Sequence, residues 1–210
     1  MLSLKTSRTL LRLLAYNKPA PSARDQTGKA RALLLPARSD NASMGEVPGN
    51  NVPIHSIGVN IGQVAPNFTL STADGGKFTL REQCAKGPVV LVFFPFAFTG
   101  VCRSELAVLT EMKQEFADLN AQVVAISCDS AYSLQAFAEK ESLEIPLLSD
   151  FWPHGQVAAQ YDVFLEDKGF ATRGTYVIDR DCIVRWSVIN GPGFERNARE
   201  YLAAVELLQR

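Results

Sequence analysis

Residues 89–109, "VVLVFFPFAFTGVCRSELAVL", contain the change of pattern that decides the fold. Residues 89–94 are apolar throughout and rich in β-branched and aromatic side chains, as expected for a strand covered on both faces. Pro95 cannot donate a ladder hydrogen bond, so we expect the strand to end there. Beyond it, apolar residues recur at helical spacing, which predicts a helix over residues 102–119. A single cysteine, Cys102, therefore stands in the first turn of a helix that follows a buried strand.

The remaining segments predict an α/β fold. Two alternating stretches around Asp74-Gly75-Gly76 indicate a β-hairpin, and residues 122–127 read as a second buried strand. The later elements follow in this order: a helix over 133–142, a strand over 145–150, a hairpin of 174–179 with 182–189, and a closing helix over 197–210. This order predicts a mixed central sheet with helices on both faces, in the arrangement of the thioredoxin-like fold.

Charge divides the chain into two parts. Residues 1–60 hold eight Lys/Arg and three Asp/Glu, whereas residues 61–210 hold thirteen and nineteen. We therefore expect a basic N-terminal extension over 1–60 and one acidic domain over 61–210. A body of that sign offers no basic face for nucleic acid. The sequence also has no apolar run near the ~20 residues that a membrane span needs.

The extension itself has two interpretations. Residues 1–24 contain five bases and no acid, and the Arg-bearing, amphipathic pattern is typical of an organellar transit peptide. Alternatively, this stretch is a dispensable leader and Met44 is the true start. Residues 17–60 carry five prolines, four glycines and no aromatic residue, so we expect a disordered linker. The expected location is cytoplasmic, or mitochondrial if the transit peptide is genuine.

The position of Cys102 favours a reactive thiol. Thr99 and Gly100 come just before the predicted helix, where side-chain oxygens cap and glycine permits a close approach. Unpaired backbone N–H groups and the helix dipole favour the thiolate over the thiol at such a position. We expect the sulfur to be exposed there and able to meet a ligand. The alternative is a small buried hydrophobic residue beside an apolar strand.

The stretch around Cys102 resembles a known family. Residues 95–102, "PFAFTGVC", match the Pro-x-x-x-Thr-x-x-Cys signature of peroxiredoxins. Residues 147–164 ("LLSDFWPHGQVAAQYDVF") and 171–180 ("ATRGTYVIDR") are similar to the one-cysteine AhpE-like (alkyl hydroperoxide reductase E) subfamily. The resemblance runs over residues 61–210. It implies a thioredoxin-like fold and thiol-dependent reduction of hydrogen peroxide and organic hydroperoxides in antioxidant defence.

The resemblance also implies a role for each site residue. Cys102 would attack the terminal peroxide oxygen and become a sulfenic acid. The Thr99 hydroxyl, the Cys102 backbone N–H and the Arg173 guanidinium would meet the charge on the leaving oxygen. Pro95 would shield the sulfur from water, and Glu105 would orient Arg173. The alternatives are a surface charge for Arg173 and a solvated helical acid for Glu105.

The other cysteines and the partners complete the prediction. Cys84, Cys128 and Cys182 form no CxxC and occupy no known resolving position, so we interpret them as structural. We therefore predict a one-cysteine enzyme without cofactor or metal, reduced by an outside thiol of the thioredoxin, mycoredoxin or low-molecular-weight type. The resemblance implies a homodimer. The alternative function is a redox-sensing chaperone or binding module with the same fold.

Overall fold

The structure is a computed structural model that describes residues 59–209 of the 210-residue chain. The basic extension expected over residues 1–60 therefore lies outside the described residues, except for its last two. The described part holds a single seven-stranded sheet and a separate two-stranded ribbon. None of its helices combines the length and the apolar character needed to cross a membrane.

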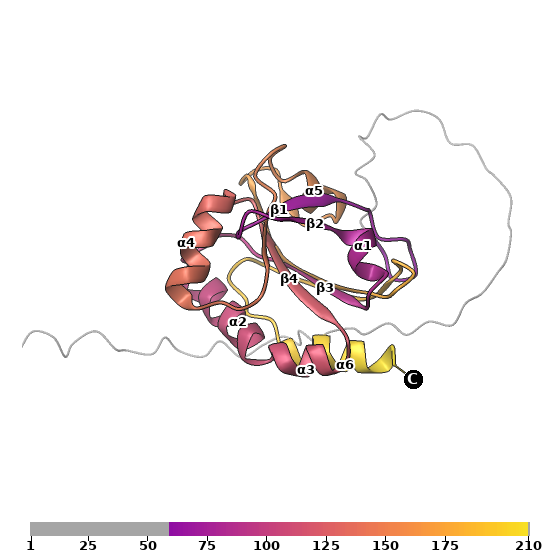
Figure 1. Ribbon diagram of the computed structural model, residues 1–210. Coiled ribbons are helices and arrows are strands. Elements are labelled where there is room, and N and C mark those ends of the chain that lie inside the picture. Colours follow the sequence, from indigo (N-terminus) through magenta and orange to yellow (C-terminus); the bar gives the residue numbers. More distant parts are fainter. Residues whose placement is uncertain (1–58, 210) are drawn as a thin grey trace, which may run out of the picture. The chain divides into compact units, whose positions relative to one another are not determined.

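The central sheet is mixed, as the sequence predicted (Figure 1). Its strand order is β2-β1-β5-β4-β3-β8-β9. β3 lies parallel to β4 and antiparallel to β8, and β4 lies parallel to β5. The strands are β1 Thr69–Thr72, β2 Lys77–Thr79, β3 Val89–Phe93, β4 Gln122–Ser127, β5 Leu147–Ser149, β8 Arg173–Ile178 and β9 Val184–Asn190; the ribbon is β6 Phe164–Leu165 with β7 Phe170–Ala171.

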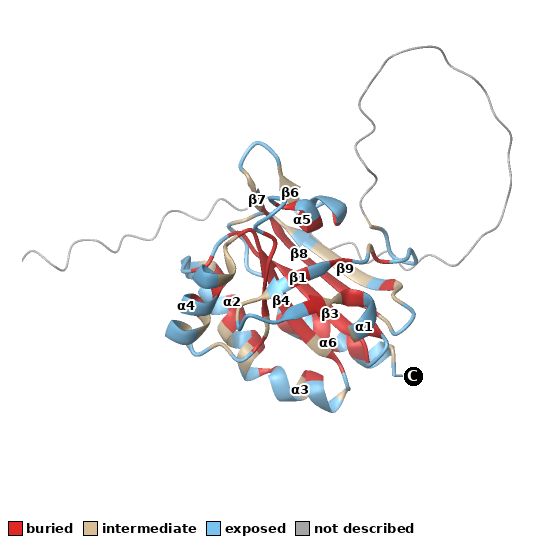
Figure 2. Ribbon diagram, turned by 45° about the horizontal axis from the view of Figure 1, so that its top comes forward, coloured by how far each residue is buried: buried red, intermediate tan, exposed pale blue. Residues whose placement is uncertain are grey.

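Helices cover both faces of this sheet, which confirms the predicted layering. The helices are α1 Leu80–Cys84, α2 Gly100–Glu111, α3 Lys113–Asp118, α4 Ala131–Glu141, α5 Gln156–Gln160 and α6 Ala198–Leu207. One core packs Val90 and Val92 of β3 against α2, α3, α4 and α6, and the other packs Val89, Leu91 and Phe93 against α1 and α5. Every residue of β3 is buried, as the continuous apolar run predicted (Figure 2).

The helix predicted over residues 102–119 is wrong as one continuous element. α2 begins at Gly100 and ends at Glu111, and α3 follows after Met112. Met112 has φ −84° and ψ 0°, which departs from helical ψ and bends the chain. Met112 and Phe116 are both buried on the same core. The apolar residues therefore keep helical spacing across the bend, and the sequence pattern does not indicate that the helix is interrupted there.

Both predicted hairpins are present. In the β1–β2 hairpin, Gly75 adopts φ 89°, a conformation that glycine reaches at low cost. In the turn between β8 and β9, the Asp179 carboxylate accepts hydrogen bonds from the backbone N–H groups of Asp181 and Ile183, each at 2.9 Å. Three short features were not predicted from the sequence: α1, α5 and the β6–β7 ribbon. Elements of two to five residues are too short to show a period.

Candidate active site

Cys102 is the third residue of α2 and lies beyond the carboxyl end of β3. The first helical turn closes there, with the Arg103 N–H donating to the Thr99 carbonyl at 2.9 Å. The expectation of an exposed sulfur is wrong, since Cys102 has 0% of its surface exposed. Its side chain packs into the core between the sheet and α2, beside Leu106 and other apolar groups. The residue is buried, but its sulfur is not in purely apolar surroundings.

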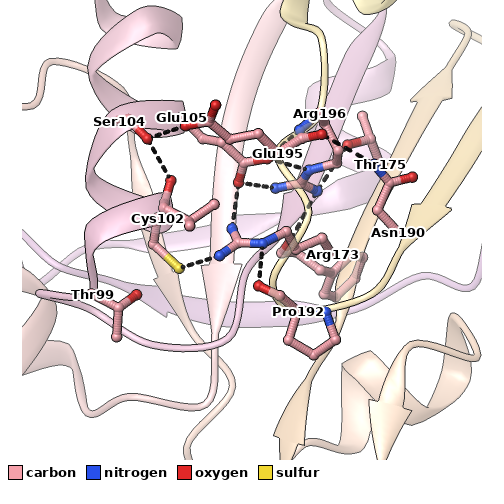
Figure 3. A network of polar contacts seen from close by, with 12 residues as sticks. Thr99, Cys102, Ser104, Glu105, Arg173, Thr175, Asn190, Pro192, Glu195 and Arg196 are labelled. Atoms are coloured by element: carbon pink, nitrogen blue, oxygen red, sulfur yellow. Dashed lines mark hydrogen bonds and ion pairs between the residues drawn. The ribbon is translucent and has the colours of Figure 1, made fainter. Parts of the chain in front are cut away.

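Arg173, the first residue of β8, reaches the sulfur (Figure 3). Its Nη2 donates a hydrogen bond to Cys102 Sγ at 3.3 Å. Its Nη1 pairs with Glu105 Oε2 at 2.5 Å, and its Nε donates to the Pro192 carbonyl at 2.7 Å. Three nitrogens of one planar group thus have three separate partners, which fixes the orientation of the guanidinium. Only 2% of Arg173 is exposed, so it is not a surface charge.

Glu105 lies one helical turn after Cys102 and is buried. Arg196 makes three hydrogen bonds to the Glu105 carboxylate. Its backbone N–H and its Nε donate to Oε1 at 2.8 and 3.0 Å, and its Nη2 donates to Oε2 at 2.9 Å. Burial alone would raise the pKa of Glu105, but the hydrogen bonds and charge of Arg196, with the charge of Arg173, outweigh it. The pKa of Glu105 therefore lies below its ordinary value, and Glu105 is a carboxylate at neutral pH.

Arg196 is a further member of the cluster that was not predicted from the sequence. It lies in the segment between β9 and α6, and it is 8% exposed. Its Nη1 anchors it to the sheet through three acceptors on β3 and β8: the carbonyl oxygens of Phe93 and Gly174 and the Thr175 hydroxyl. The sequence pointed to Arg196 only indirectly. A buried Glu105 carboxylate has more acceptor sites than Arg173 alone can fill, so a second donor residue is needed.

The charges of this cluster favour a negative sulfur. Arg173 and Arg196 carry two positive charges and Glu105 carries one negative charge, so the buried groups next to Cys102 have an excess of one positive charge. A buried charge is stabilised when a counter-charge lies within hydrogen-bond distance. Ionisation of Cys102 supplies that counter-charge. A negative charge on the Cys102 sulfur would therefore have a positive partner, Arg173, within hydrogen-bond distance.

Thr99 and Pro95 lie on the segment that connects β3 to α2. Pro95 is buried and Thr99 is exposed. Thr99 occupies the N-cap position of α2, but its hydroxyl donates to the Phe96 carbonyl at 3.1 Å and makes no capping bond. The expected side-chain cap is therefore wrong. Among the residues described, no hydrogen bond joins the Thr99 hydroxyl to the Cys102 sulfur.

Comparisons with known proteins identify the family of the chain. Residues 61–187 match the AhpC/TSA family. The chain belongs to the AhpC/TSA family. Over 150 residues it is 41% identical to alkyl hydroperoxide reductase E of Mycobacterium tuberculosis, covering 71% of this chain and 98% of that protein. It is 32% identical to a chloroplastic 2-cysteine peroxiredoxin of Chattonella marina, covering 72% and 81%. The crystal structure of peroxidoxin BcpB from Mycobacterium tuberculosis matches with a TM-score of 0.65 and 32% identity, covering 72% and 99%.

This AhpC/TSA protein is thus a peroxiredoxin with the thioredoxin-like fold, as the sequence resemblance implied. It is a thiol-dependent peroxidase with an antioxidant role. Peroxiredoxins act on hydroperoxides with thiol reductants. The alternative of a redox-sensing chaperone or binding module is not favoured by these relatives.

The other cysteines of this peroxiredoxin are free thiols. Cys84 precedes β3 and Cys182 follows β8, so both lie at the end of the sheet opposite Cys102. Burial raises the pKa of Cys84 far above its ordinary value, and the hydrogen bond that its neutral thiol shares with Cys182 adds to the increase. Cys128 follows β4, at the same end of the sheet as Cys102. Burial, with the charge of Asp150 as the next cause, raises its pKa to about 12.

Proposed function

We propose that Cys102 is the peroxidatic nucleophile of this peroxiredoxin and that the other three cysteines take no part in the reaction. The observation that carries the proposal is the hydrogen bond from Arg173 to Cys102 Sγ inside a buried cluster with an excess positive charge. A thiolate is the form of cysteine that attacks peroxides, and this cluster favours that form.

In the first step, the Cys102 thiolate attacks the terminal oxygen of a hydroperoxide, ROOH. The S–O bond forms as the O–O bond breaks, so the sulfur becomes a sulfenic acid and the leaving group departs as RO⁻. RO⁻ then takes a proton from water and leaves as the alcohol, or as water when the substrate is hydrogen peroxide. Arg173 is the group placed to meet the charge that develops on the leaving oxygen.

Thr99, Pro95 and Glu105 support this step in different ways. The Thr99 hydroxyl lies at the start of α2, where it donates to the Phe96 carbonyl, and it would donate to a bound peroxide instead. Pro95 is buried at the end of β3 and limits access of water to the sulfur. Glu105 acts through Arg173, because their ion pair at 2.5 Å fixes the direction of the guanidinium.

In the second step, an outside thiol reduces the sulfenic acid. Its sulfur attacks Cys102, water leaves, and a mixed disulfide forms; a second thiol then releases Cys102 and carries away the disulfide. Cys84 and Cys182 lie at the far end of the sheet, and the raised pKa of Cys128 leaves it almost entirely protonated at neutral pH. We propose a reductant of the thioredoxin, mycoredoxin or low-molecular-weight thiol type.

Intact-mass analysis tests the proposal. One equivalent of peroxide should add 16 Da to the wild type at Cys102 and nothing to Cys102→Ser, because a serine oxygen does not ionise near neutral pH. The same oxidised sample, treated in parallel with thioredoxin, mycoredoxin and a small thiol, reports which class of reductant restores the mass. Turnover above a few per cent of wild type in Cys102→Ser would refute the assignment.

We also propose a homodimer and a cellular location. Several large apolar side chains are exposed, among them Phe151, Trp152 and Phe194, which is consistent with an interface between copies. Sedimentation at micromolar concentration tests the homodimer, and a monomer would count against it.

The basic, acid-poor residues 1–24 support mitochondrial targeting, and otherwise we propose a cytoplasmic enzyme. A fluorescent fusion with and without residues 1–43 distinguishes the two.

A further inference from the structure

The segment from Pro95 to Thr99 must hold an unfavourable backbone conformation. Phe98 has φ 64°, a left-handed value that is uncommon for residues with a side chain and costly for a bulky one. Such a conformation persists only where surrounding contacts over-determine it, and it is commonly found at functional sites. The segment carries Pro95 and Thr99 and leads directly into Cys102. Contacts that fix residues 95–99 therefore also affect the position of the Cys102 sulfur.

Asp129, which follows β4, makes a hydrogen bond that fixes this segment. Its Oδ2 accepts a hydrogen bond from the Ala97 backbone N–H at 2.9 Å and another from the Ser127 hydroxyl at 2.8 Å. The backbone carbonyl of Asp129 accepts a hydrogen bond from the Ser149 hydroxyl at 2.6 Å, which also ties the backbone of Asp129 to β5. Among residues 59–209, the Ala97–Asp129 bond is the one hydrogen bond that joins residues 95–99 to a part of the fold other than β3 and α2.

The other contacts of the segment are less directional. The ring of Phe96 packs on Phe170 with a centroid distance of 4.7 Å, and that of Phe98 packs on Phe137 at 4.9 Å. Both phenylalanines remain about 40% exposed. Aromatic contacts of this kind tolerate sliding, whereas a hydrogen bond to a fixed carboxylate defines one position of the backbone.

The two half-reactions place different demands on this segment. Both reactants must reach the Cys102 sulfur, which has no exposed surface in the described conformation. Attack on hydrogen peroxide needs only a small opening and uses the arrangement of Cys102 with Arg173. A thiol reductant is larger than hydrogen peroxide, so the segment that leads into Cys102 must move further for the second half-reaction than for the first.

We propose that Asp129 is a positioning residue for the peroxidase reaction: by accepting the Ala97 N–H, it holds residues 95–99 in the arrangement that reacts with peroxide. This inference rests on the proposed role of Cys102. It follows that loss of the Asp129 carboxylate slows the peroxide step and speeds reduction of the sulfenic acid. A hydrogen bond to a charged group is strong enough to shift each rate by about tenfold.

The test measures the two half-reactions separately in the full-length protein. Sulfenic acid formation is followed by quenched-flow intact mass with dimedone trapping, and its removal is followed with thionitrobenzoate as the thiol. For Asp129→Ala we expect a peroxide step about tenfold slower and a thionitrobenzoate step faster by a similar factor. Asp129→Asn keeps an acceptor oxygen without the charge and should lie between Asp129→Ala and wild type in both rates.

Asp179→Ala is the matched control. Its carboxylate also accepts backbone N–H bonds, from Asp181 and Ile183, but at the end of the sheet opposite Cys102. It should reduce the melting temperature without moving either rate. If Asp129→Ala does not fold, the comparison uses Asp129→Asn, together with hydrogen–deuterium exchange over residues 95–99, which should be faster than in wild type.

Rates that stay unchanged in the Asp129 variants, or that fall together in proportion to lost stability, would overturn the inference. Failure of the proposed function is distinguishable from this result. It would show as wild-type protein that forms no sulfenic acid at Cys102, whatever occupies position 129.

Discussion

Replacing Arg173 with alanine removes the donor nearest the Cys102 sulfur and changes the charge of the buried cluster. In the wild type, two guanidinium groups and one carboxylate leave one positive charge for the thiolate to balance. In Arg173→Ala, Arg196 and Glu105 balance each other, and a thiolate would be a buried charge without a counter-charge. We therefore expect a smaller thiolate fraction at neutral pH and a slower peroxide step.

The size of the effect follows from the two roles of the same group. One well-placed donor to a developing oxyanion contributes ~3 kcal/mol, or about 10²-fold in rate. Loss of the hydrogen bond and of the positive charge at the sulfur slows the peroxide step further. The structural cost is smaller, because Glu105 retains its three bonds from Arg196. The rate should thus fall by far more than the stability does.

The assay is the second-order rate of sulfenic acid formation, measured by stopped-flow tryptophan fluorescence across pH, with Trp152 and Trp186 as reporters. Arg173→Lys should recover only part of the rate, since one ammonium group cannot hold Pro192, Glu105 and the sulfur in the directions of a planar fork. Arg185→Ala, which removes an exposed arginine paired with Asp179, is the control and should react at the wild-type rate. An Arg173→Ala variant that reacts within threefold of wild type, with an unchanged thiol titration, would refute the reasoning.

Three further predictions concern the rest of the chain. Replacing Cys84, Cys128 and Cys182 together with serine or alanine should leave both the peroxide step and reduction by an outside thiol unchanged; a disulfide that includes Cys102 in peptide maps of oxidised wild type would show that a second cysteine takes part. Glu105→Gln should lower the melting temperature most above the ordinary carboxyl pKa of 4.5. Because the pKa of Glu105 is lowered in the folded protein, its stabilising contribution is lost as the pH falls through that lowered pKa. The difference in melting temperature between Glu105→Gln and wild type should therefore become smaller in acid, and a constant difference from pH 7 to pH 3 would contradict the prediction. Deleting residues 1–43 should leave an active enzyme, because the described site residues lie between 95 and 196; a large fall in melting temperature would show that the deleted part stabilises the domain.

The sequence predicted the sheet and the large helices well because their signals are local. The continuous apolar run of β3 and the 3.6-residue spacing in α2 and α6 each depend on a few neighbouring residues. The bend at Met112 was not predictable in this way, because the residues on both sides of it face the same core. The cap expected from Thr99 failed for a related reason: a hydroxyl chooses among nearby acceptors, and here the Phe96 carbonyl is available.

The site was predictable only in part, since its charges come from elements far apart in the chain. Glu105 and Cys102 share a helix, but Arg173 and Arg196 arrive 68 and 91 residues after Glu105. Nothing in the composition around Arg196 separates it from the other Lys and Arg residues, and its role appears only when the chain after β9 folds back over α2.

The burial of Cys102 and its expected reactivity are compatible because of this same cluster. Sequence position suggested an exposed thiol activated by a helix terminus, an effect that is small at a solvated surface and grows where water is excluded. Burial by itself would oppose ionisation of the sulfur. Arg173 offsets that cost directly, and Glu105 and Arg196 keep Arg173 aimed at the sulfur without neutralising the whole cluster. A single buried arginine without them would be free to leave the site, and a second carboxylate would cancel the charge that favours the thiolate. The count of two arginines to one acid is therefore the feature that makes the proposed nucleophilic role of Cys102 compatible with a sulfur that has no exposed surface.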